Sequence, residues 1–175
     1  AEEKIAIAEK AMEKAISLSP DDPELYERLA YVLTAVQPPR SADADYRMNE
    51  MVFANPESFD ALLRRGRYWV RAAFTRESDQ QGQLVKNAVQ DACAAMQKAI
   101  TIIADEADRQ SPALPETKAL KQALMNLPDK PPTAKEIISP EYPQALVTAN
   151  GAAIALEGKL KGISKEIEAC RDSLF

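Results

Sequence analysis

The chain has 175 residues, a formal net charge of −5 and no histidine. This length suits one domain with a sizeable buried core, and the apolar content excludes a disordered tail. The missing histidines remove the commonest general base and metal ligand, while the acidic balance disfavours a nucleic-acid binder. No apolar run approaches the roughly 20 residues of a membrane span, so we expect a soluble chain with no membrane-spanning segment.

Helical periodicity starts at the N-terminus. Residues 3–20 place Ile5, Ala8, Met12 and Ala15 on one helical face. Further helices are expected over about 24–36, 42–54 and 58–74, each with apolar residues at steps of three and four. Prolines separate these segments, because proline stops one helix and suits the first turn of the next.

Two of these breaks are alike and lie one repeat apart. Ser19-Pro20-Asp21-Asp22-Pro23 and Asn55-Pro56-Glu57-Ser58 each end one helix and begin another, and Pro20 and Pro56 are 36 positions apart. Equivalent positions follow each proline at matching distances: Tyr26, Leu29-Ala30 and Leu33 after the first, and Leu62, Arg65-Gly66 and Trp69 after the second. The helices that precede the prolines carry Ala8, Met12 and Ala15, then Ala44, Met48 and Met51, and a later helix carries Ala92, Met96 and Ala99.

This register resembles the tetratricopeptide repeat (TPR), whose period is about 34 residues. The resemblance covers residues 1–110 as a half repeat and two full repeats, with degenerate sequences. It implies an all-α fold in which antiparallel helix pairs stack as a short right-handed superhelix. A polar insert is expected over about 75–84, followed by a helix from Leu84 to Arg109. The pattern begins in mid-repeat, so we expect the chain to be part of a larger protein.

The C-terminal part has a different composition. Residues 111–143 hold seven of the twelve prolines; a short helix is expected over 116–127, and Ile137 and Ile138 are expected to fill an apolar gap. Residues 144–175 form an apolar seam from Leu146 to Leu174. One interpretation is a long helix that caps the repeats within a single structural domain. The other is a coiled-coil seam that forms a homodimer.

One basic cluster stands out in this acidic chain. Arg64, Arg67 and Arg71 lie at steps of three and four and therefore share a helical face. In TPR proteins the first helix of each pair lines a concave groove, and by that resemblance the groove candidates are Arg28, Tyr31, Thr34, Leu63, Arg64, Arg67 and Arg71. Guanidinium groups bind carboxylates well, so an acidic peptide is a candidate ligand. The simpler interpretation is that these arginines pair with neighbouring Asp and Glu.

These observations favour a non-enzymatic scaffold that binds a protein or peptide partner in a helical groove. The alternative is a structural or oligomerisation module that uses the C-terminal helix. No catalytic, metal-binding or cofactor-binding residues are expected, because the chain has no histidine, no Gly-rich phosphate loop and no metal-ligand spacing. Cys93 and Cys170 are expected to be buried thiols, although a disulfide between them stays open.

Overall fold

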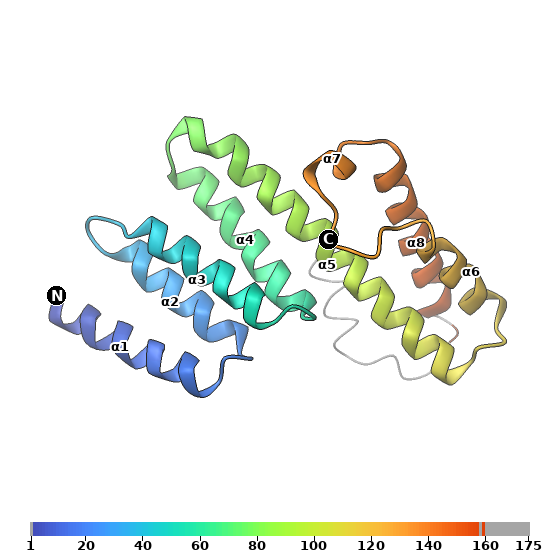
Figure 1. Ribbon diagram of the computed structural model, residues 1–175, viewed down its shortest axis with the longest axis horizontal. Helices are drawn as coiled ribbons and strands as arrows, with labels where there is room; N and C mark the ends of the chain where they lie inside the picture. Colours follow the sequence, from blue (N-terminus) through green and yellow to red (C-terminus); the bar gives the residue numbers. More distant parts are fainter. Residues whose placement is uncertain (1, 158, 160–175) are drawn as a thin grey trace. The chain divides into compact units, whose positions relative to one another are not determined.

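The structure is a computed structural model that describes residues 2–157 and Lys159. Within this part the chain forms eight helices and no strand (Figure 1). They are α1 (Glu2–Leu18), α2 (Pro23–Ala35), α3 (Ser41–Ala54), α4 (Phe59–Thr75), α5 (Ser78–Gln110), α6 (Pro115–Leu124), α7 (Ala134–Ile137) and α8 (Glu141–Glu157). The expected all-α class is confirmed for these residues. The chain divides into two compact units, Ala1–Leu84 and Val85–Phe175, and the division falls inside α5.

In the first unit, α2 is the central helix. It packs against α1, α3 and α4, and neighbouring helices run antiparallel (Figure 1). The apolar positions that the periodicity indicated form the core: Leu29, Met48 and Met51 are fully buried. Asp22 caps α2 by accepting a hydrogen bond from the backbone N–H of Glu24 at 3.0 Å. Such caps and the Pro23 start fix where the helix begins.

Side chains join the two similar breaks directly. The Asn55 side-chain amide donates to the carbonyl oxygen of Pro20 at 3.1 Å, and the Tyr26 hydroxyl donates to the same oxygen at 3.2 Å. Asn55 also donates to the carbonyl of Met51 at 3.0 Å, at the end of α3. The end of α3 is therefore held against the end of α1, although the two are more than 30 residues apart.

The second unit has its own core, made by the later part of α5 with α6 and α8. Its buried residues are Ile100, Ala104, Ala107, Leu120, Ala123, Leu127, Tyr142, Leu146, Ala149, Ala153 and Leu156. The Pro-rich segment is fastened to α5 by two glutamines one heptad apart. Gln90 donates to the carbonyl of Pro132 at 2.9 Å, and Gln97 donates to the carbonyl of Pro128. The Tyr142 hydroxyl donates to the side-chain oxygen of Gln97 at 3.1 Å.

Several sequence expectations need correction here. The polar insert before Leu84 is mostly helical, because α5 begins at Ser78 and its polar residues are exposed. Ile138 is 83% exposed and fills no gap, whereas Ile137 packs on the core of the second unit. The helix expected from residue 144 starts at Glu141, since Pro143 is tolerated in its first turn.

The first part of the predicted C-terminal seam is buried within the chain. Leu146, Ala149, Ala153 and Leu156 all belong to the core of the second unit. The remaining seam positions from Leu160 to Leu174, and with them Cys170, lie outside the described residues. Cys93 is half-buried, and burial raises the pKa of its thiol. The prediction of a single structural domain stays a prediction.

Candidate binding face on helices α2 and α4

Helices α2 and α4 each bury one face and leave another face at the surface. In α2 the buried residues are Tyr26, Leu29, Ala30 and Leu33, which leaves Glu27, Tyr31 and Thr34 outward. In α4 the buried set includes Ala61, Leu62, Tyr68, Trp69 and Ala72, with Arg67 and Arg71 exposed. The two outward faces are joined side by side by ion pairs, so they form one continuous surface.

Glu27 is the centre of that connection. Its carboxylate accepts from Arg64 at 2.6 Å and from Arg71 at 3.0 Å, and its side chain is only 20% exposed. Arg64 also donates to Asp60 at 2.7 Å, one turn earlier on α4. Burial alone would lower the pKa of Arg64, but the hydrogen bonds to Asp60 and Glu27 more than offset it and the pKa is raised. The guanidinium of Arg64 is therefore already paired within the chain, where it links α4 to α2.

The other groove candidates differ in their surroundings. Arg28 pairs with Glu24 along the surface of α2, where both side chains are at least half exposed. Leu63 is buried, with 7% of its surface exposed, so it packs inside the unit and does not reach the predicted groove. Arg67 is exposed and makes no ion pair or hydrogen bond with the part of the chain that the structure describes. It is the groove candidate whose charge is available to a ligand.

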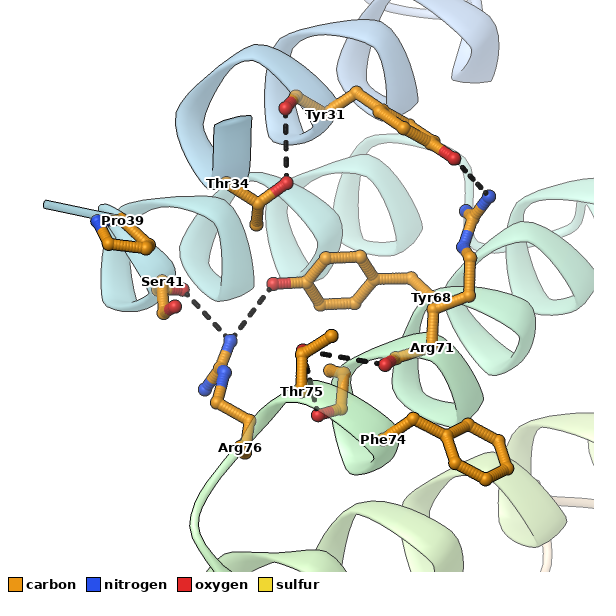
Figure 2. A pocket seen from close by; sticks show the side chains of 10 residues that line it. Tyr31, Thr34, Pro39, Ser41, Tyr68, Arg71, Phe74, Thr75 and Arg76 are labelled. Atoms are coloured by element: carbon orange, nitrogen blue, oxygen red, sulfur yellow. Dashed lines mark hydrogen bonds between the residues drawn. The ribbon is translucent and has the colours of Figure 1, made fainter. Parts of the chain in front are cut away.

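A pocket of about 480 Å³ lies where α2 and α4 end and α3 begins (Figure 2). Three of the sequence-predicted residues, Tyr31, Thr34 and Arg71, line it. The other lining residues are Pro39, Ser41, Tyr68, Ala72, Phe74, Thr75 and Arg76. Arg71 lies over the Tyr31 ring, with its guanidinium carbon 4.9 Å from the ring centroid, and donates to the Tyr31 hydroxyl at 3.4 Å. A cation held in this way is oriented by the ring and by Glu27 together.

A second polar cluster adjoins the pocket, which its members Tyr68 and Arg76 line. Arg76 donates to both carboxylate oxygens of Asp45, at 3.0 and 2.8 Å, and to the Tyr68 hydroxyl at 3.2 Å. The Tyr68 hydroxyl donates to Asp45 at 2.5 Å. Burial, and then the carboxylate of Asp45, raise the pKa of Tyr68 well above its usual value. We call these three residues the Asp45 cluster; it ties the end of α4 to the start of α3.

Sequence reasoning did not assign this cluster or Phe74 to the site. Arg76 follows the basic cluster in the sequence, but it lies just past Thr75, where α4 ends, so helical spacing does not group it with the others. Asp45 gave no signal, because a single acidic residue on a helix is usually solvated. Phe74 is 85% exposed at the end of α4, and nothing in the sequence signals this, because α4 also carries buried apolar and aromatic residues such as Leu62 and Trp69.

The rest of the described chain offers no competing metal site or membrane segment. Residues 2–157 contain no group of three side chains that could hold a metal ion. None of the helices described is both long and apolar enough to cross a bilayer. In the comparisons with known proteins, no family model, no curated protein and no solved structure matches this sequence.

Proposed function

We propose that this chain is a non-enzymatic, TPR-like scaffold, which binds a protein or peptide segment on the face formed by α2 and α4. The observation that carries the proposal is the pocket beside Tyr31 and Arg71, which lies on the face that the repeat register predicted for ligand binding. Its volume falls in the range of about 300–1,000 Å³ that is typical of ligand pockets.

The pairing of side chains supports a stack of repeats. Arg47 pairs with Glu13, 34 positions earlier, and Arg64 pairs with Glu27, 37 positions earlier. The first pair links α3 to α1 and the second links α4 to α2. Helices that alternate along the chain are thus linked at a separation close to one TPR period, as expected if equivalent helices lie in successive layers.

Exposed apolar and cationic groups support the binding role of this face. Tyr31 is 57% exposed and Phe74 is 85% exposed, and Arg67 is solvated nearby in α4. Aromatic residues and arginine are the side chains that contribute most to protein interfaces. A surface that combines them with a concave pocket differs from the ordinary polar face of a surface helix.

The test is capture of peptides on an array of extended segments, with the intact chain and two charge-reversal variants. Arg67→Glu changes the exposed cation of the face without breaking an internal ion pair. Lys118→Glu is the matched control, because Lys118 is also an exposed helical cation whose side chain makes no ion pair or hydrogen bond within the described residues. The proposal expects peptides that bind the wild type and Lys118→Glu but bind Arg67→Glu several-fold more weakly. Equal binding by all three, or capture of no peptide, would refute the proposed binding face.

A further inference from the structure

The pocket between α2 and α4 contains two arginines, and each already has a carboxylate partner. Arg71 donates to Glu27 at 3.0 Å, and Arg76 makes a bidentate pair with Asp45. Both carboxylates belong to the chain itself. The charge at the pocket wall is therefore neutralised before any ligand arrives.

The remaining wall is apolar and aromatic. Tyr31 and Tyr68 contribute rings, Pro39 and Ala72 contribute aliphatic surface, and Phe74 lies at the rim (Figure 2). Thr34 and Thr75 also line the pocket, but their hydroxyls donate to backbone carbonyls of their own helices. The chain thus satisfies its own polar groups here and leaves mainly apolar surface for a ligand.

We propose that this pocket binds a neutral aromatic side chain of an extended peptide and not a carboxylate. This inference rests on the proposed peptide-binding function and specifies the ligand chemistry. An incoming carboxylate would lose its water and gain no unpaired cation, because it would have to displace Glu27 or Asp45. A phenyl or phenol ring loses little on leaving water, and its apolar surface matches the apolar and aromatic walls. The charge balance of the pocket therefore selects the neutral side chain.

The first experiment uses two small probes of the same backbone, N-acetyl-phenylalanine amide and N-acetyl-glutamate amide. Each is titrated into the ¹⁵N-labelled full chain, and the backbone amide shifts are followed by NMR. The phenylalanine probe is expected to shift the resonances of Thr34 and Thr75, which line the pocket. The glutamate probe is expected to leave them unchanged at the same concentration. A larger shift with the glutamate probe, or no shift with either, would overturn the inference.

Two exposed phenylalanines provide a matched pair of variants. Phe74 at the pocket rim and Phe53 on α3, outside the pocket, are 85% and 86% exposed, so neither change should alter folding. Phe74→Ala is expected to weaken binding of the phenylalanine probe by about tenfold or less, as for the loss of one aromatic contact. Phe53→Ala is expected to have no effect. Thr75→Phe, which adds a ring inside the pocket, is expected to abolish the shift at Thr34.

The inference and the proposed function can fail separately. Peptides captured on the array are scanned with alanine, residue by residue. If binding depends on acidic residues and not on an aromatic one, the proposed function stands and the ligand chemistry inferred here is wrong. If no peptide is captured at all, the proposed function is wrong whatever the small probes do.

Discussion

The Asp45 cluster should contribute more to the stability of the first unit than any exposed ion pair of that unit. Asp45 accepts three hydrogen bonds, two from Arg76 and one from Tyr68, and the Arg76 side chain is only 14% exposed. A hydrogen bond to a charged group contributes about 1.5–3 kcal/mol, and breaking a fully buried ion pair costs about 3–5 kcal/mol. Asp45 itself is 27% exposed, so water replaces part of what is lost. We therefore expect Asp45→Ala to lower the free energy of unfolding by about 2–3 kcal/mol.

The smaller change Tyr68→Phe leaves the ion pair between Asp45 and Arg76 in place. It removes the donor to Asp45 and the acceptor of the 3.2 Å hydrogen bond from Arg76, so the expected cost is about 1–2 kcal/mol. In the double variant Asp45→Ala/Tyr68→Phe the costs of the two single changes should not add, because Asp45→Ala already removes the acceptor of the Tyr68 hydroxyl. The expected coupling energy is about 1 kcal/mol. Asp43→Ala is the control: Asp43 pairs with Arg40 at 2.7 Å but is 54% exposed, so we expect a change within about 0.5 kcal/mol.

The assay is urea unfolding of the full chain, followed by tryptophan fluorescence. Trp69 is the only tryptophan in the sequence and lies in the first unit beside Tyr68, so its emission reports on that unit. The free energies come from the transition midpoint and slope. If Asp45→Ala and Asp43→Ala have equal effects, the cluster is no more than a solvated ion pair and the reasoning is refuted.

Three further predictions follow from other contacts. The pKa of Tyr68 is raised in the folded chain, so its protonated hydroxyl contributes stability that is fully present below the ordinary pKa of 10.0 and is lost as the pH rises above it. Between about pH 9 and 11 the wild type should therefore lose more stability than Tyr68→Phe. Urea midpoints that fall equally in both proteins over this range would contradict this. Asn55→Ala removes two donated hydrogen bonds, one of them to Pro20, and should cost about 1 kcal/mol by the same fluorescence assay; no change would mean that water replaces both bonds. Gln97→Leu leaves the Pro128 carbonyl and the Tyr142 hydroxyl without their hydrogen-bond partner, so trypsin should cleave faster after the exposed Lys135. The control Gln122→Leu, at an exposed position, should leave the cleavage rate unchanged. Equal rates for the two variants would show that Gln97 does not hold the Pro-rich segment against α5.

The sequence alone determined where the first helices lie and which residues they bury. Prolines at residues 20, 23 and 56 mark the breaks, and steps of three and four predict the buried set that includes Leu29, Met48 and Met51. These features could be read because helix ends and helix faces depend on neighbours within a few residues. The same local rules failed at residues 78–84, which the composition predicts as a polar insert but which form the first turns of α5. Their polar side chains can face solvent from a helix as well as from a loop.

Only the tertiary structure decided which charges remain available on the proposed binding face. Spacing along α4 groups Arg64, Arg67 and Arg71, but it carries no information about Glu27, which lies on another helix and forms ion pairs with two of the three. The Asp45 cluster was hidden for the same reason, because Asp45 meets Arg76 across 31 positions of sequence. Ion pairing depends on distances between side chains of packed helices, and those distances are fixed by the packing of whole helices and not by the local pattern.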